Sequence, residues 1–108
     1  LLALETFVTD DHRLLFNELA PRPHNSFHWT IEGCANSQFT QLVRAVVGMP
    51  FGNTNCYGQW QMDNLLGEDM TRLDGLASTN GLHLHLYGKA EIKPGRKMGH
   101  TNRQIKPA

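Results

Sequence analysis

Two prolines and a cluster of polar side chains interrupt the first half of the chain. The stretch NELAPRPHNSFHWT spans residues 17–30. A residue that precedes proline is pushed out of helical geometry, so the segment around Pro21 and Pro23 must be extended. The two prolines therefore fix Arg22 and His24 relative to the element that ends before them. Any fold of this chain has to place a rigid, polar loop between two regular elements.

The segments on either side of this loop differ in their periodicity. LLALETFVTDDHRLLFNEL consists of two apolar runs around a polar turn at residues 9–12, a pattern that predicts a β-hairpin. After the loop, apolar residues recur at helical spacing from Ile31 to Met49. Thr30 is the expected N-cap, and Gly48 and Pro50 supply the stop. One long helix is therefore expected.

The second half of the chain has a different character. QWQMDNLLG and the alternating LHLHLYG predict two strands, and EDMTRLDGLASTNG predicts a loop or a short helix between them. The predicted fold class is α+β. A β-hairpin and a long helix form residues 1–49, and a small β-rich domain forms residues 50–108.

The composition excludes several classes of protein. Hydrophobic residues make up 40% and charged residues 19%, which is ordinary for a globular chain. No apolar run reaches bilayer length and no signal peptide is recognisable, so a cytoplasmic location without membrane contact is expected. Cys34 and Cys56 lack a CxxC spacing and are expected to be buried thiols. Because the chain starts without methionine, we expect it to be a piece of a longer protein.

Basic residues are concentrated near the end of the chain. Residues 1–88 carry four Arg or Lys against nine Asp or Glu, whereas residues 89–108 carry six against one. The segment YGKAEIKPGRKMGH is compatible with a solvated tail, a nucleic-acid contact or a phosphate clamp. It is short and poor in aromatic residues, which argues against nucleic acid. Lys89, Arg96 and Lys97 suit a small phosphate better.

Each strand of the predicted hairpin carries one carboxylate, Glu5 or Glu18. Side chains two apart share a face, so each would lie among apolar residues, where a carboxylate is costly unless it is compensated. Mg²⁺ commonly joins one or two carboxylates to nucleotide phosphates, so a Mg²⁺ site is one interpretation. The other is that both carboxylates face solvent. Asn17 is expected to point away from Glu18, or to lie in a turn at the strand end.

The PRPHNS loop also allows two interpretations. Arg22 offers a planar fork suited to carboxylate or phosphate, and Asn25 and Ser26 add neutral hydrogen-bond partners. Beside the N-terminus of the following helix these groups would form an anion site. The alternative is an ordinary connection. His83 and His85 are expected on the polar face of a strand, since no third ligand stands at a recognisable spacing.

Several of these segments together resemble a known family. LLFNELAPRPHNSFHWTIEGCANSQFTQLVRAVVGMPFG, MDNLLGE and HLYGKAEIKPGRKMGH are similar, in the same order, to segments of the N5-carboxyaminoimidazole ribonucleotide synthetases, the ATPase subunits of phosphoribosylaminoimidazole carboxylase. The NExAPRPHNSxHWT run is far more specific than any general ATP-grasp pattern. The chain is thereby identified as the C-terminal part of an ATP-grasp module followed by the C-terminal domain of that family.

The resemblance implies an ATP-dependent ligase of purine biosynthesis that carboxylates 5-aminoimidazole ribonucleotide with bicarbonate, through carboxyphosphate, and releases ADP and phosphate. It implies ATP and Mg²⁺ as cofactors, with Glu5 and Glu18 as metal ligands and Asn17 and Glu18 at the nucleotide. Arg22 and His24 are implied in catalysis. The substrate-binding residues that it implies are Arg22, His24, Asn25, Ser26, Lys89, Arg96 and Lys97.

The same resemblance sets the expected partners. These are the small-molecule substrates, a second copy of the chain and the mutase that uses the product, with no nucleic acid and no membrane. Family members are several times longer, so the isolated chain is expected to be inactive. The alternative is a non-catalytic phosphate-binding or interaction module, which would need no metal carboxylates. The chain departs from the family at Phe27, where Gly is usual, and at its end, HTNRQIKPA.

Overall fold

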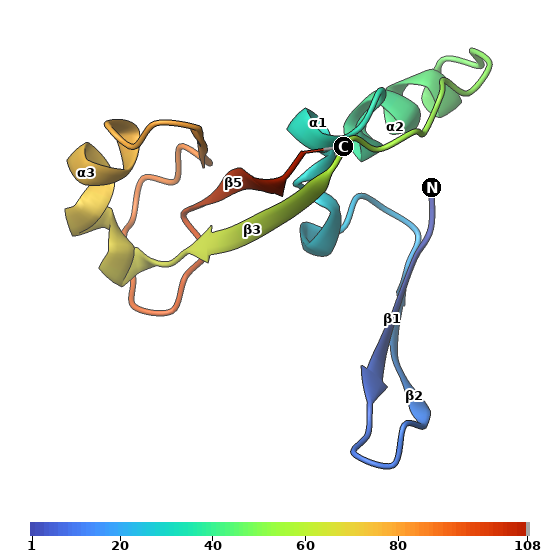
Figure 1. Ribbon diagram of the computed structural model, residues 1–108, viewed down its shortest axis with the longest axis horizontal. Helices are drawn as coiled ribbons and strands as arrows, with labels where there is room; N and C mark the ends of the chain where they lie inside the picture. The colour runs from blue at the N-terminus through green and yellow to red at the C-terminus, as the bar shows by residue number, and fades with distance from the viewer. Residues whose placement is uncertain (108) are drawn as a thin grey trace. The chain divides into compact units, whose positions relative to one another are not determined.

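The computed structural model describes residues 1–107 and divides the chain into two compact units, one of Leu1–Asn55 and one that begins at Cys56. The first unit contains β1 (Ala3–Val8), β2 (Leu14–Ala20), the 3-10 turn η1 (Asn25–Phe27), α1 (Thr30–Gly33) and α2 (Gln38–Val46) (Figure 1). The second contains β3 (Gln59–Leu65), η2 (Gly67–Arg72), α3 (Leu73–Ala77), β4 (Leu82–Leu86) and β5 (Gly99–Lys106). The predicted α+β class is confirmed.

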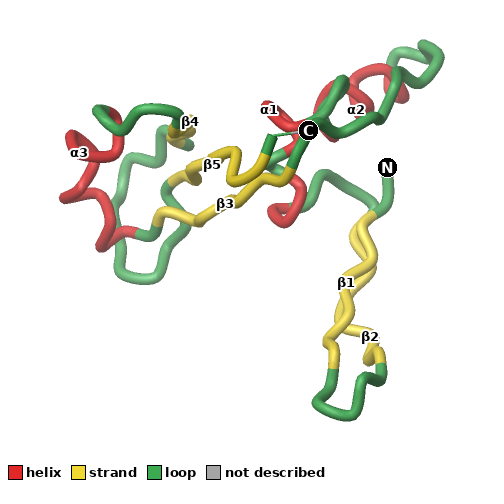
Figure 2. The backbone as a smooth tube through the Cα atoms, viewed as in Figure 1, coloured by secondary structure: helices red, strands yellow, loops and turns green. Residues whose placement is uncertain are grey.

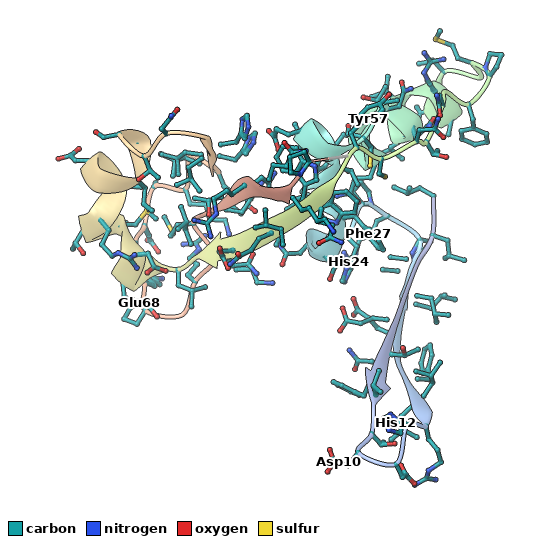
Figure 3. All side chains as sticks on the ribbon, viewed as in Figure 1. Asp10, His12, His24, Phe27, Tyr57 and Glu68 are labelled. Atoms are coloured by element: carbon teal, nitrogen blue, oxygen red, sulfur yellow. The ribbon has the colours of Figure 1, made fainter. Side chains whose placement is uncertain are left out.

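Strands β1 and β2 form the predicted antiparallel hairpin. The turn is closed by a hydrogen bond from Thr9 N to Arg13 O of 2.9 Å, and His12 adopts a left-handed φ of 62°. A type I turn followed by a left-handed residue is a common way to close a short hairpin loop. Asp10 and His12 lie at this turn, whereas His24 and Phe27 lie toward the opposite end of the hairpin (Figure 3). The polar loop thus begins far from the turn.

The hairpin contains a β-bulge at the position of the candidate site. Glu5 pairs directly with Glu18, but the next pair is Thr6 with Phe16, so Asn17 is an extra residue in β2. An extra residue breaks the strict alternation of side chains and bends the strand. The simple rule that neighbouring side chains point to opposite faces therefore fails at Asn17.

The expectation of one long helix after the loop is wrong. Two short helices, α1 and α2, take its place, because Cys34 adopts an extended conformation with φ −131° and ψ 156°. Ala35 N donates to Asn55 O at 2.8 Å, which satisfies a backbone group outside any helix. Ser37 then caps α2, accepting from Thr40 N. Thr30 is the first residue of α1 and does not serve as its N-cap.

The sheet of the second unit has the strand order β3-β5-β4, with both pairings antiparallel (Figure 2). The predicted strands at 59–67 and 82–87 are confirmed as β3 and β4. The central strand, β5, was not expected, because its residues alternate poorly and resemble a polar tail. Gly99, His100, Thr101 and Asn102 are nevertheless buried, since β5 is flanked by a strand on each side.

The interior of each unit is small and largely polar. The buried hydrophobic residues are Ala3, Ala20, Leu65 and Met98, whereas the buried polar residues are His24, Gln38, Gln41, His100, Thr101 and Asn102. Most apolar side chains of the hairpin are exposed. Among the described residues, no helix has the length and apolar character needed to cross a membrane.

The expectation of two buried thiols is wrong. Cys34 and Cys56 are both disulfide-bonded, Cys34 is half-buried and Cys56 is exposed. The absence of a CxxC spacing does not exclude a disulfide, because the bond depends on which residues the fold brings together.

Candidate active site

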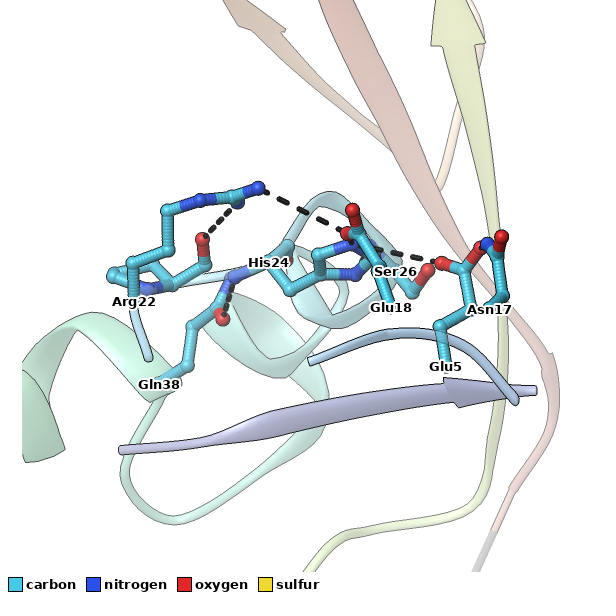
Figure 4. Close-up of polar contacts among 8 residues, drawn as sticks. Glu5, Asn17, Glu18, Arg22, His24, Ser26 and Gln38 are labelled. Carbon is cyan, nitrogen blue, oxygen red and sulfur yellow. Dashed lines mark hydrogen bonds and ion pairs between the residues drawn. The ribbon is translucent and has the colours of Figure 1, made fainter. Parts of the chain in front are cut away.

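The two carboxylates of the hairpin meet the ring of His24 (Figure 4). His24 Nε2 lies 2.7 Å from Glu18 Oε1 and 3.5 Å from Glu5 Oε2. The three side chains can each direct one ligand atom into a common space, with those atoms within 4.8 Å of one another. Direct pairing of Glu5 with Glu18 across the hairpin explains why two like charges lie so close together.

Asn17 belongs to the same cluster. Its Nδ2 donates to Glu5 Oε1 at 2.6 Å, so the amide reaches the carboxylate on the neighbouring strand. The expectation that Asn17 points away from the carboxylate face is wrong, because the bulge places both Asn17 and Glu18 opposite Glu5. One amide donor then offsets part of the repulsion between the two carboxylates.

The tautomer of His24 follows from its neighbours. Ser26 N donates to His24 Nδ1 at 3.3 Å, and a backbone N–H can only donate. In the neutral ring Nδ1 therefore carries no proton, and Nε2 carries it and donates to the Glu18 carboxylate. An Nε2 that bears a proton cannot also ligate a metal. His24 thus orients Glu18, and with this tautomer it would not itself ligate a metal held by the two carboxylates.

Arg22 approaches the same carboxylate from the proline-framed loop. Its Nη2 lies 3.8 Å from Glu18 Oε1, and its Nη1 donates to Pro23 O at 3.2 Å. Both side chains are about half exposed or more, so this ion pair contributes little to stability. The guanidinium is consequently available to an anion. Asn25 and Ser26 start the η1 turn directly after His24.

The donor set fits Mg²⁺. Two carboxylates are the protein ligands this ion commonly uses, together with water and nucleotide phosphates. The side chains of Glu5 and Glu18 are 39% and 45% exposed, which leaves room for such outer ligands. The arrangement is compatible with a metal site at Glu5 and Glu18, which stays a prediction.

The predicted phosphate residues lie in the second unit, on the loop between β4 and β5. Lys89 Nζ donates to Lys97 O at 2.6 Å and lies 5.6 Å from the centre of the Tyr87 ring. Arg96 Nη1 donates to Glu91 O at 3.2 Å. Lys89 also borders a hollow of about 140 Å³ whose other lining residues are Met70, Leu86, Gly88, Ile92 and Met98. The three cations therefore share one loop.

Two residues that support these loops have no motif in the sequence. Gln38 binds the backbone of His24, and Glu68 Oε2 accepts from Gly95 N at 2.9 Å and so ties the basic loop to η2. The sequence gives only a weak indication that Gln38 has a structural role. Gln38 and Gln41 are polar residues three apart on an otherwise amphipathic helix, and both are buried.

Two family models match the chain. The ATP-grasp domain matches residues 1–39, and the phosphoribosylaminoimidazole carboxylase C-terminal domain matches residues 61–104. Residues 1–39 are therefore part of an ATP-grasp domain. The second match extends through residue 104, so the expectation that the chain departs from the family at its end, HTNRQIKPA, is wrong for residues 100–104.

Individual relatives support the same family assignment as the two family models. The N5-carboxyaminoimidazole ribonucleotide synthase of Brucella melitensis is 51% identical over 98% of this chain and 29% of its own length. A crystal structure of the ADP complex of such a synthetase is 49% identical, with a TM-score of 0.85 over 94% of this chain and 27% of that one. The Aspergillus clavatus enzyme in complex with ADP and 5-aminoimidazole ribonucleotide is 34% identical, with a TM-score of 0.86, over 96% and 30%.

The chain belongs to the N5-carboxyaminoimidazole ribonucleotide synthase family, which confirms the resemblance read from the NELAPRPHNSFHWT run. It spans less than a third of the length of these curated relatives.

Proposed function

We propose that this chain forms the metal- and substrate-contacting part of an ATP-dependent ligase that carboxylates 5-aminoimidazole ribonucleotide with bicarbonate and releases ADP and phosphate. The observation that carries the proposal is the direct pairing of Glu5 with Glu18, joined by Asn17 and His24, in a member of this family. In this proposal residues 1–49 belong to the ATP-grasp module and residues 50–108 to the C-terminal domain.

Glu5 and Glu18 are the proposed ligands of Mg²⁺, and Asn17 and Glu18 are the proposed contacts to ATP. When bound, the ion neutralises the charge of the β- and γ-phosphates. Asn17 holds Glu5 through its 2.6 Å hydrogen bond, and His24 holds Glu18 at 2.7 Å. The two carboxylates are thus oriented before any ligand arrives, which reduces the ordering cost of binding.

Arg22 and His24 are the proposed catalytic residues. A bicarbonate oxygen attacks the γ-phosphorus of ATP and ADP leaves. The amine nitrogen of the ribonucleotide then attacks the carboxyl carbon, the bond from that carbon to the phosphate oxygen breaks, and the departing phosphate takes up the amine proton. Arg22, free of a tight ion pair, stabilises the negative charge of these species. Asn25 and Ser26 are proposed to orient the imidazole substrate. Lys89, Arg96 and Lys97 are proposed to bind its phosphate, because phosphate pairs well with clustered cations.

The proposed partners are small molecules, namely 5-aminoimidazole ribonucleotide, bicarbonate and ATP. A second copy of the chain and the mutase that uses the product are further proposed partners. The chain alone is proposed to be inactive, because its relatives are more than three times as long.

A chimera tests the function. The stretch of the Brucella melitensis relative that matches this chain would be replaced by residues 1–108, and phosphate release dependent on 5-aminoimidazole ribonucleotide and bicarbonate would be measured. We expect the chimera to be active. Glu18→Gln should lower its activity at least about tenfold and raise the Mg²⁺ concentration needed, since loss of even an outer-shell partner costs this much.

Asp10→Asn is the matched control, because it removes an exposed carboxylate of the same unit at the hairpin turn. We expect Asp10→Asn to leave the activity of the chimera and the Mg²⁺ concentration that it needs unchanged. A folded chimera that binds inorganic phosphate but forms no product would instead favour the non-catalytic module. Equal effects of Glu18→Gln and Asp10→Asn would rule out the assigned metal role.

A further inference from the structure

Gln38 binds the backbone of His24 with both ends of its side-chain amide. Gln38 Oε1 accepts from His24 N at 2.8 Å, and Gln38 Nε2 donates to His24 O at 2.9 Å. Both bonds are buried, and the residue itself is 7% exposed. One side chain therefore engages both polar backbone groups of one loop residue, as a neighbouring strand would.

A third hydrogen bond completes the set. Gln38 Nε2 lies 2.8 Å from His28 Nδ1, which must accept because the amide nitrogen can only donate. Both Nε2 protons and the Oε1 atom of Gln38 are thus used. The polarity of the His24 backbone fixes the orientation of the amide, so a carboxylate at position 38 would face the His24 carbonyl with an acceptor instead of a donor.

The backbone of His24 is also constrained by the preceding prolines and by Phe27 N, which donates to His24 O at 3.0 Å. His24 precedes the three-residue turn η1 and has an extended backbone with φ −117° and ψ 144°. Its ring must nevertheless reach Glu18 Oε1 at 2.7 Å across the end of the hairpin. A short 3-10 turn has too few internal hydrogen bonds to hold a side chain in place by itself. The first residue of α2 supplies that support.

We propose that Gln38 is the positioning residue of His24, and that its buried amide holds the His24 Nε2–H against the Glu18 carboxylate. The value of that geometry for carboxylation rests on the proposed function. The positioning itself does not, because it concerns only the contacts of this chain.

Gln41 provides a matched control on the same helix. Gln41 Nε2 donates to Gly52 O at 2.8 Å, and Gly52 N donates to Gln41 Oε1 at 3.0 Å. Gln41 is also 7% exposed. The two glutamines therefore make the same pair of backbone hydrogen bonds from equally buried positions, but the loop held by Gln41 carries no site residue.

The test compares Gln38→Glu with Gln41→Glu in the full chain by nitrogen-15 NMR of the histidine rings. At a pH where the histidine rings are neutral, His24 of the unaltered chain should show distinct ring nitrogens, with the proton on Nε2. Gln38→Glu should abolish this distinction as the ring exchanges between tautomers, and Gln41→Glu should preserve it. An unchanged His24 in Gln38→Glu, or equal loss in both variants, would overturn the proposal.

A second measurement needs no variant and covers the case in which Gln38→Glu fails to fold. The side-chain amide protons of Gln38 should exchange with solvent at least about tenfold more slowly than those of the exposed Gln59, because they are buried and bonded. Equal exchange rates would contradict the proposal. If the chimera is inactive while Gln38→Glu selectively alters His24, the proposed function fails and the positioning role stands.

Discussion

At the scale of single residues, Tyr87 makes the stability of the second unit depend on pH in the alkaline range. Its hydroxyl lies 2.9 Å from His100 Nδ1, and its backbone N donates to Met98 O at 2.9 Å. Partial burial raises the pKa of Tyr87 above its ordinary value of 10.0, because the phenolate is less well solvated there. The folded state therefore holds the phenolic proton more tightly than the unfolded state does.

This pKa shift predicts the sign of the pH dependence. The contribution of Tyr87 to stability is fully present below the unfolded pKa of about 10 and is lost as the pH rises through the higher folded value. We expect the melting temperature to fall above about pH 10, and to fall less steeply in Tyr87→Phe. Thermal melts of both proteins between about pH 8 and pH 11 would measure the difference. Parallel curves would contradict the expectation.

The residues of the candidate site differ in how far they could be predicted. One carboxylate on each strand follows from the hairpin pattern, whereas the contact of His24 with both carboxylates was not predicted. The direction of Asn17 does not follow, because β2 begins with three consecutive apolar residues, and such a run has no alternation from which a bulge could be predicted. Gln38 acts through the backbone of another residue, so only the three-dimensional contacts reveal it. Position 27, where the family usually has Gly, carries Phe. The centre of its ring lies 6.5 Å from the centre of the His24 ring, and nothing in the structure explains why Phe stands at this position.

At the scale of secondary-structure elements, Gly99 is a point of close approach between two strands of the three-stranded sheet. It begins β5 and pairs with Leu65 on one side and Leu86 on the other. A Cβ atom at this position would lie 2.3 Å from the backbone oxygen of His85. Backbone cannot move aside as a flexible side chain can, so only glycine allows β4 to approach so closely.

Gly99→Ala is therefore expected to destabilise the second unit by about 1–3 kcal/mol, the usual cost of overpacking. Gly75→Ala in α3 is the control, because a Cβ there meets nothing within 4 Å. Replacing that helical glycine should stabilise by up to about 1 kcal/mol. Chemical denaturation of both variants checks the opposite signs. A neutral Gly99→Ala would show that β4 can move away from β5.

The prediction of elements succeeded where patterns were strong and local. The hairpin, β3 and β4 follow from periodicity. The break between α1 and α2 was missed because the apolar spacing continues across it, while Ser37 and a backbone bond from Ala35 decide the matter. Strand β5 was missed because its burial comes from its neighbours, and its polar residues carry no strand signal.

At the scale of the whole chain, the sheet of the second unit depends on its last strand. Strands β3 and β4 each pair with β5 and not with one another. A chain that ends at residue 98 should lose amide protection throughout β3 and β4. The hairpin of the first unit should keep its protection, because β1 and β2 pair with each other. Hydrogen exchange followed by NMR measures both, and protected β3 amides in the shortened chain would contradict the expectation.

The same strand order determines when each sheet can form while the chain is being synthesised. The hairpin can close within about 1–10 μs of its second strand becoming available, because Asn17 and Glu5 are only 12 positions apart. Gln61 must wait for Arg103, 42 positions later, which takes about 2–8 s at ordinary rates of translation. During this interval β3 leaves the ribosome with no partner for its backbone. Strand β3 therefore has unpaired backbone groups throughout this interval, and a chaperone could protect it from pairing with another chain.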